Sequence, residues 1–538
     1  MVGQFVARLR PAMRRTAKQR ADVSSAPVES PIDVPRLSAR LAATGPTQTL
    51  ASPFTGEPLG ELPTSTLADV TAAAARAREL QREWAARPIE DRAAVLLRFH
   101  DRLLDRRDAF IDLIQLEGGK ARLSAAEEVL HVALTAGYYG RHARQYLHDE
   151  RGDGIFPVLT RIDRHYVPKG LVGVIAPWNY SMTMAISDGL AALVAGNGLI
   201  LKPDHQTPLV AVAAVELLVE CGMPEGLWQV VHGLGPVVGP QLIDVSDYVC
   251  FTGSTATGRA VAARCADRLI GCSLELGGKN PLVVLDDADV EVAAEGAVRA
   301  SFSNAGQLCV STERIYVVES LMADFCERLV ARTMALRLGN SLDYEHDIGG
   351  LINLAQVGRV SGHVEDARAK GATVLTGGRR REDLGPLFYE PTVLTGVTPD
   401  MACYAGETFG PVVSVYPVSG EEEAVAKANE SEYGLNASVW TADPARGRRV
   451  AAKIKCGTVN VNEGFAATFG SIDAPMGGMK HSGLGRRQGR EGIRRFVEVQ
   501  SVGTQSGLPL APSHGVSAKT FTTAVTTMMR VFRRIGRA

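Results

Sequence analysis

The sequence has few cysteines and almost no net charge, and each of these features excludes some classes of protein. Its 538 residues include eight cysteines, none of which forms a CxxC pair or a tight ligand cluster. This spacing argues against a disulfide scaffold, and no metal site is expected. The 58 lysines and arginines nearly balance the 59 acidic residues, so nothing suggests a nucleic-acid-binding protein. We expect an enzyme of the reducing cytoplasm with free thiols.

Long apolar runs are also missing. No stretch approaches the roughly 20 apolar residues that a membrane-spanning helix needs. Residues 1–20 carry six basic residues and no acid, but no apolar core follows as a secretory signal would require, so residues 1–44 are expected to form a basic arm.

The C-terminal tail, residues 506–538, is basic as well. Apolar residues recur in it at helical spacing, beside four arginines: Phe521, Val525, Met528, Phe532 and Ile535. Such a segment could lie on a partner subunit or on an anionic membrane surface. We expect a loosely ordered tail and regard membrane contact as the less favoured interpretation.

The chain is too long for one hydrophobic core, so two or more domains are expected. Residues 67–120 and 127–146 have helical spacing. Residues 171–259 then repeat a strand, loop and helix four times. This alternation predicts an α/β fold with a doubly wound, dinucleotide-binding sheet.

Two glycine-containing loops fall within these repeats. Gly235 and Gly239 belong to a GxGxxG-like run with one extra residue, which alone is a weak signal because glycine turns are common in α/β proteins. In the next repeat, Gly253, Ser254 and Gly258 could hold a pyrophosphate at a helix N-terminus. The two loops support each other.

A cysteine and a glutamate suggest covalent catalysis. Cys309 lies in SFSNAGQLCVSTERIYV (residues 301–317), and Glu275 opens ELGGKNP (275–281), 309 − 275 = 34 positions earlier. A thiolate is a strong nucleophile, and a carboxylate can activate the water that releases an acyl group. Other cysteines in apolar segments are expected to be small core residues: Cys250, Cys326 and Cys456.

Motifs in a fixed order resemble the aldehyde dehydrogenase superfamily over residues 45–500. They are APWNY (176–180), KPDHQTP (202–208), FTGSTATG (251–258), ELGGKNP, NAGQLC (304–309), ETFGPVV (407–413), YGLNASVW (433–440) and GTVNVN (457–462). Within it, the chain most resembles the second, mycobacterial type of succinate-semialdehyde dehydrogenase, which uses NADP. This likeness runs through PLFYEPTVLT (386–395), residues 474–479 and the basic C-terminal tail.

The resemblance implies a role for each motif residue. Cys309 would attack the aldehyde, the Asn179 amide and the Cys309 N–H would hold the oxyanion, and Glu275 would activate water for thioester hydrolysis. The residues expected to bind the cofactor are Lys202, His205, Trp178, Gly235, Gly239, Ser254, Glu407 and Phe409. Those expected to line the substrate pocket are Tyr180, Met184, Ser303, Leu308 and Phe465.

Cofactor choice depends largely on His205. Relatives that prefer NAD often have a glutamate at this position, and a carboxylate would repel a 2′-phosphate. We therefore predict NADP, with NAD possible and with Lys202 supplying positive charge.

The substrate is harder to predict. Typical succinate-semialdehyde dehydrogenases resemble one another in two arginines, and this chain has Ser303 at one position and AISD (185–188) at the other. Either another cation, such as Arg141 or Arg314, binds a substrate carboxylate, or the substrate is a less polar aldehyde. A CoA-acylating dehydrogenase or a non-catalytic relative is less favoured, because Glu275 and the other catalytic residues are present.

The resemblance also implies a domain plan and a homodimer or homotetramer. The cofactor domain would span residues 45–145 and 170–277, and the catalytic domain residues 278–485. Residues 146–169 and 486–505 would form a small β oligomerisation arm, in which the strand at 496–502 pairs with a partner catalytic domain.

Overall fold

The computed structural model describes residues 32–156, 159–506, 510–513, 515–534 and 536. They divide into two compact units, which are described separately. The larger comprises residues up to 146 together with 168–496, and the smaller comprises 147–167 together with the residues after 496. Most of the predicted basic arm, residues 1–31, lies outside the described residues.

The larger unit contains a six-stranded sheet that is parallel except for one edge strand. Its order is β19 (Gly483–Leu484), β9 (Gly271–Glu275), β8 (Tyr248–Thr252), β5 (Leu171–Ile175), β6 (Gly198–Lys202) and β7 (Trp228–Val230). Every residue of β5 and β6 is buried, which is why these strands are continuous apolar runs in the sequence.

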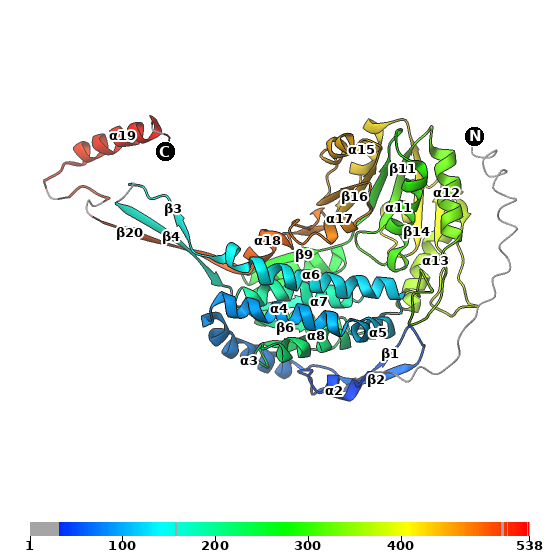
Figure 1. Cartoon of the computed structure of the whole chain (residues 1–538), viewed down its shortest axis with the longest axis horizontal. Coiled ribbons are helices and arrows are strands. Elements are labelled where there is room, and N and C mark those ends of the chain that lie inside the picture. Colours follow the sequence, from blue (N-terminus) through cyan, green and yellow to red (C-terminus); the bar gives the residue numbers. More distant parts are fainter. Residues whose placement is uncertain (1–31, 157–158, 507–509, 514, 535, 537–538) are drawn as a thin grey trace. The chain divides into compact units, whose positions relative to one another are not determined.

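Helices cover both faces of this sheet (Figure 1). One face packs against α3 (Leu67–Ala86), α9 (Gly235–Val245) and α10 (Thr255–Asp267). On the other side, α7 (Ser181–Val194) and α8 (Leu209–Glu220) pack beside α4 (Ile89–Asp105), with α5 (Arg107–Gly118) and α6 (Arg122–Leu147) nearby. The four predicted strand, loop and helix repeats are therefore confirmed as β5–α7, β6–α8, β7–α9 and β8–α10.

The long helical region divides into three helices rather than one. Pro88 precedes α4 with φ −49° and ψ 144°, and its ring and missing N–H prevent α3 from continuing. A second break falls at Arg106, where φ is −103° and ψ is 14°. Helix α6 begins at Arg122, five residues before the predicted start.

Strand register aligns the carboxyl ends of the first sheet. Ile175 pairs with Lys202 and with Phe251, and Thr252 pairs with Glu275. Side chains at the ends of β5, β6, β8 and β9, or just after them, therefore meet at one edge, where open α/β sheets bind ligands.

A second sheet of seven strands forms the rest of the larger unit. Its order is β12 (Thr373–Thr376), β13 (Thr392–Thr395), β14 (Val412–Val418), β11 (Thr312–Val318), β10 (Asn280–Val284), β16 (Asn436–Trp440) and β17 (Thr458–Val461). Its helices are α11 (Val290–Phe302), α12 (Met322–Met334), α13 (Leu354–Ala369), α15 (Glu421–Asn429) and α16 (Pro444–Ala451). A large core that includes Phe325 and Val413 joins this sheet to α11, α12 and α13.

Short elements complete the larger unit. They are α2 (Val34–Ser38), β1 (Thr47–Ala51), β2 (Pro58–Pro63), the 3-10 turn η2 (Ser303–Gly306), α14 (Ala402–Ala405), β15 (Tyr433–Gly434), α17 (Ala466–Phe469), β18 (Met479–Lys480) and α18 (Gly489–Arg494).

The smaller unit has a three-stranded sheet in the order β20 (Val497–Gln505), β4 (Thr160–Pro168) and β3 (Glu150–Gly152), followed by α19 (Ala518–Arg534). The strand predicted at 496–502 therefore pairs with β4 of its own chain and is an outer strand of this sheet. Residues 486–496, expected in the arm, belong to the larger unit.

Candidate active site

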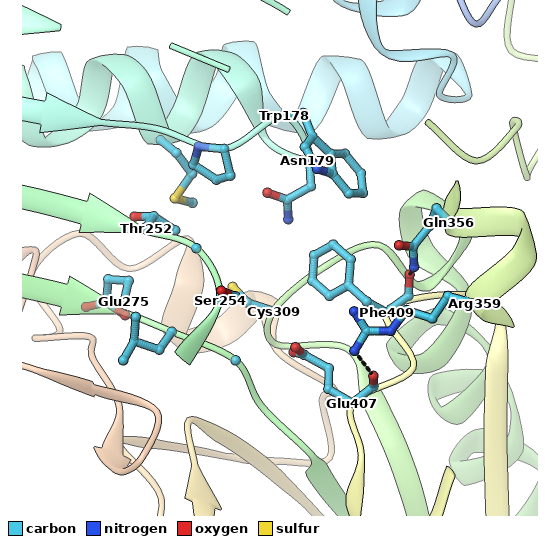
Figure 2. A pocket seen from close by; sticks show the side chains of 15 residues that line it. Trp178, Asn179, Thr252, Ser254, Glu275, Cys309, Gln356, Arg359, Glu407 and Phe409 are labelled. Carbon is cyan, nitrogen blue, oxygen red and sulfur yellow. Dashed lines mark hydrogen bonds between the residues drawn. The ribbon is translucent and has the colours of Figure 1, made fainter. Parts of the chain in front are cut away.

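A pocket of about 220 Å³ lies within the larger unit and is lined by residues that follow strands of the first sheet and precede strands of the second. Its lining includes Trp178, Asn179, Ser254, Glu275, Cys309, Glu407 and Phe409. Figure 2 shows Asn179 and Phe409 directed into the same space beside Cys309 and Glu407. With Gln356 and Arg359 of α13, which also line it, side chains from six separate segments of the sequence converge on one cavity.

Cys309 lies in a loop between η2 and β11 and is partly exposed. Three consecutive residues with left-handed backbone precede Cys309: Asn304 (φ 52°), Ala305 (φ 55°) and Gly306 (φ 70°). A Cβ atom at Gly306 would lie 2.1 Å from the Gly410 carbonyl oxygen, so only glycine fits there. Because a left-handed non-glycine residue costs roughly 1–3 kcal/mol, surrounding contacts must hold this loop.

Asn179 follows β5 and is 6% exposed. Its side-chain amide donates to the Gln307 carbonyl oxygen at 3.0 Å, and Gln307 lies two residues before the cysteine. The Lys120 ammonium donates to the Asn179 backbone oxygen at 2.5 Å. These bonds fix Asn179 from both its backbone and its side chain.

Lys120 belongs to a buried ion pair that sequence reasoning missed. Its Nζ lies 2.5 Å from the Glu128 carboxylate, and the two side chains are 2% and 0% exposed. Glu128 also accepts from the N–H groups of Met182 (2.8 Å) and Thr183 (3.2 Å) in the first turn of α7. One buried pair therefore holds both the Asn179 carbonyl group and the start of the helix that follows it.

Glu275 ends β9 and is 6% exposed. Its Oε1 is buried and has no hydrogen-bond partner within the described part of the chain. Burial raises the pKa of Glu275 to about 7, against the opposing effect of Arg487. A carboxylate with a free oxygen and a pKa near neutrality is suited to proton transfer from water.

Arg487 and Arg495 both pair with Asp188, which lies in the AISD stretch of α7. The contacts are 3.0 and 2.7 Å, and all three side chains are buried. Sequence reasoning did not find this cluster, because Asp188 and Arg487 are 299 residues apart. It places positive charge near Glu275 without occupying the Glu275 carboxylate.

The surroundings of Cys309 favour the thiol over the thiolate. Burial, followed by the negative charges of Glu275 and Glu407, raises the pKa of Cys309 to about 12. The nucleophile must therefore lose its proton in the course of the reaction, and a neighbouring base or cation must assist.

Glu407 and Phe409 are fixed before β14. The Gly278 N–H donates to the Glu407 carboxylate at 2.8 Å, and burial raises the pKa of Glu407 to about 7. The Phe409 ring meets Trp178 edge to face, with centroids 5.6 Å apart. Glu407, Phe409 and Trp178 all line the pocket.

Three side chains hold the segment around Phe409, which has φ 54°. Glu313 accepts from the Phe409 N–H at 3.0 Å and forms a buried ion pair with Lys279. From α13, Gln356 donates to the Phe409 carbonyl oxygen and Arg359 to that of Glu407, both at 2.6 Å (Figure 2). These supporting residues were not predicted either.

The predicted cofactor residues fit a dinucleotide. Lys202 is 3% exposed, and burial lowers the pKa of its ammonium group against the opposing charge of Asp204. Nothing lies within 4 Å of a Cβ atom built at Gly235, which begins α9, a helix without a side-chain cap; at Gly239 the nearest atom is 4.0 Å away. Ser254 caps α10 by accepting from the Thr257 N–H. Two helix N-termini can therefore receive phosphate oxygens.

His205 lies beside an acid. Its Nδ1 is 3.2 Å from the carboxylate of Asp204, which is close to Lys202. The end of β6 and the loop after it therefore combine two basic side chains with one acid.

Among the predicted substrate residues, Met184 lines the pocket. Tyr180, Leu308 and Phe465 are buried, and the Tyr180 hydroxyl donates to Glu127 at 3.2 Å. Ser303 is partly exposed and donates to the Arg299 carbonyl oxygen at 2.8 Å.

The two candidate carboxylate anchors were wrong. Arg314 is buried and uses its guanidinium on the carbonyl oxygens of Lys279, Lys427 and Ala428 and on the Tyr316 hydroxyl. Arg141 is exposed on α6. Neither lines the pocket.

Comparison with known proteins agrees with this geometry. A Mycolicibacterium smegmatis protein named "Putative succinate-semialdehyde dehydrogenase [NADP(+)]" is 50% identical over 482 residues, which cover 90% of this chain and 93% of the relative. The mitochondrial succinate-semialdehyde dehydrogenase of Oryza sativa is 36% identical over 85% of this chain and 86% of its own. Among solved structures, an E. coli NADP-dependent enzyme superposes with a TM-score of 0.82 at 33% identity, covering 86% of this chain and 95% of that one.

The predicted fold is thereby confirmed: both sheets belong to an architecture shared with solved aldehyde dehydrogenases, among them one from Brucella melitensis with a TM-score of 0.83. The model of the aldehyde dehydrogenase family matches residues 41–502. The chain therefore belongs to the aldehyde dehydrogenase family.

Proposed function

We propose that the protein oxidises succinic semialdehyde to succinate with NADP, through a thioester on Cys309. The observation that carries this proposal is the convergence of Cys309, Asn179 and Glu275 on one pocket. The names of the mycobacterial and plant relatives support the substrate, and the mycobacterial names support the cofactor.

In the first step the Cys309 sulfur attacks the aldehyde carbon, and the thiol proton passes to the Glu275 carboxylate. The new C–S bond leaves an oxyanion, which the Asn179 amide and the Cys309 backbone N–H stabilise. The hydrogen bond from Asn179 to Gln307 shows which way the amide is held before substrate arrives.

NADP, when bound, would supply the hydride acceptor that conversion of the oxyanion to the thioester requires. Glu407 would hold the nicotinamide ribose and Phe409 would pack beside the ring. Lys202 and His205 would face the adenosine ribose and its 2′-phosphate.

Hydrolysis completes the cycle. Glu275, after releasing its first proton to solvent, takes a proton from water, and the hydroxide attacks the thioester carbon. The C–S bond breaks, the acid leaves, and the sulfur recovers a proton. The unpartnered Oε1 of Glu275 is the atom available for this water.

A less polar aldehyde is the second candidate. The pocket walls proposed for the substrate are Tyr180, Met184, Leu308 and Phe465, which are buried and largely apolar. Their character favours a neutral aliphatic or aromatic aldehyde, because a dry pocket penalises an unpaired carboxylate.

A panel of aldehydes tests the proposal. Turnover with NADP and with NAD is measured for succinic semialdehyde and for neutral aldehydes of equal and greater length. A higher kcat/KM for succinic semialdehyde supports the proposal. A preference for the neutral aldehydes replaces the substrate but keeps the mechanism, and no NADP or NAD reduction with any aldehyde rejects both.

We also propose that the enzyme is a cytoplasmic homodimer or homotetramer. Its eight free cysteines suit a reducing compartment. β20 is an outer strand of its sheet, and outer strands can add a strand from a partner subunit.

A further inference from the structure

The C-terminal helix α19 is a two-faced surface helix, and the proposed reaction gives it no role. It spans 17 residues, Ala518–Arg534, and none of them is buried. Ser517 fixes its start by accepting from the Thr520 N–H at 3.1 Å. The sequence predicts a loosely ordered tail here, whereas the structure has nearly five helical turns.

One face of α19 is apolar along its whole length. Phe521, Val525, Met528 and Phe532 follow one another at intervals of four, three and four residues, which places them on a single stripe. No residue of this stripe belongs to a hydrophobic core cluster of the described chain.

The opposite face is basic and rich in threonine. At roughly 100° per residue, Arg530 lies about 180° around the helix from Phe521. The cations of the helix are Lys519, Arg530, Arg533 and Arg534. Thr522, Thr523 and Thr527 donate to carbonyl oxygens four residues earlier, so their hydroxyls are satisfied within the helix.

The charged side chains of this helix are all positive, and this determines which kind of partner it can bind. No aspartate or glutamate follows Glu498 in the sequence. Two copies of α19 packed together could form no salt bridges beside their apolar seam, although paired helices commonly use such bridges. An anionic lipid surface accepts an apolar stripe and attracts the cations at the same time.

We propose that α19 binds the surface of membranes that contain anionic phospholipids, lying in the plane of the interface. No helix of the described residues is long and apolar enough to cross a membrane. The stripe would enter the boundary between headgroups and acyl chains, and the four cations would face the phosphate groups.

The full-length protein is mixed with phosphatidylcholine vesicles that contain or lack phosphatidylglycerol, and the bound fraction is measured by sedimentation. We expect binding to the anionic vesicles only, and release as salt is raised. Absence of binding at low salt overturns the proposal, and so does equal binding to both kinds of vesicle.

Two variants with the same change in charge separate the stripe from simple electrostatics. Met528→Glu places a carboxylate within the apolar face, whereas Thr523→Glu places one on the basic face. We expect Met528→Glu to weaken vesicle binding at least tenfold and Thr523→Glu to weaken it severalfold less. Equal losses would reject insertion of the stripe.

Two further measurements keep the test independent of folding and of the proposed reaction. Circular dichroism and aldehyde turnover should stay unchanged in both variants, because neither residue belongs to the candidate active site. Light scattering without vesicles reports the oligomeric state. If Met528→Glu dissociates the oligomer instead of reducing vesicle binding, the stripe binds a second copy of the chain and the proposal is wrong.

Discussion

The two sheet edges that meet in the pocket are built in different ways. On the first sheet, Asn179, Ser254 and Glu275 stand at or just after the ends of parallel strands, with ordinary backbone. On the second, Cys309 and Phe409 precede strands, in loops that include left-handed residues. At the first edge, the strand ends position the side chains without backbone strain. At the second edge, the left-handed residues add strain energy, which buried contacts must offset.

The largest expected effect concerns the nucleophile of the strained edge. Cys309→Ala should lower aldehyde-dependent NADPH formation by at least roughly 10⁴-fold, because no other side chain can form the thioester. Cys326→Ala, a buried core cysteine, is the matched control and should keep its turnover. Retention of activity in Cys309→Ala would remove the nucleophile assignment.

Breaking the ion pair behind Phe409 should destabilise the second edge. Lys279→Met leaves the Glu313 carboxylate buried without its cation, and such losses cost about 3–5 kcal/mol. Urea unfolding measures the free energy of unfolding, and the KM for NADP should rise because Glu407 and Phe409 lose their support.

The control for that variant is Arg379→Met, which breaks an ion pair with Glu390 in which the arginine is 77% exposed. Its unfolding midpoint should hardly move, since exposed pairs contribute little. Equal destabilisation in the two variants would contradict the role given to burial.

The equivalent change on the first edge should affect chemistry more than cofactor binding. Lys120→Met removes the ammonium group from the Asn179 carbonyl, so the oxyanion donor loses its fixed position and kcat should fall roughly 10²-fold. The KM for NADP should change less than in Lys279→Met. If kcat and the KM for NADP changed by the same factors in Lys120→Met and Lys279→Met, the proposed difference between the two edges would be wrong.

The pH dependence should follow Glu275. With a pKa of about 7, this group is protonated in acid and ionised above neutrality, so the rate of thioester hydrolysis should rise about tenfold per pH unit below pH 7 and then level off. Rapid-quench measurement of acyl-enzyme decay checks this. In Glu275→Gln the dependence should vanish and the acyl-enzyme should accumulate.

The smallest expected effect is on cofactor choice. His205→Glu adds negative charge beside Asp204, so the ratio of kcat/KM for NADP to that for NAD should fall about fivefold to tenfold. His205→Gln separates the loss of imidazole from the gain of a carboxylate. Equal efficiency of the unchanged enzyme with both cofactors would undo the argument from this position.

More of the first edge than of the second could be predicted from the sequence. The apolar run LVGVI shows where β5 ends, so the position of Asn179 could be predicted locally. Glu275 was found from its motif ELGGKNP, because β9 (GCSLE) is not an apolar run. The helix break at Pro88 could also have been predicted, because proline lacks a backbone N–H and its ring clashes with the preceding turn of a helix.

The supporting contacts could not be read from the sequence. Lys279 and Glu313 are 34 residues apart, and Arg487 and Asp188 are 299 apart, so only the folded topology shows that they pair. Arg314 failed as a substrate anchor for the same reason, because its burial among backbone carbonyl groups depends on strands that are distant in sequence.

The contact between Gly306 and Gly410 limits how this enzyme can acquire new substrates. No side chain fits between the two backbones, so the loop that carries Cys309 and the loop that carries Phe409 must shift together or stay in place. Laboratory evolution of substrate range should therefore select changes in side chains such as Met184, which lines the pocket, and should leave both glycines untouched.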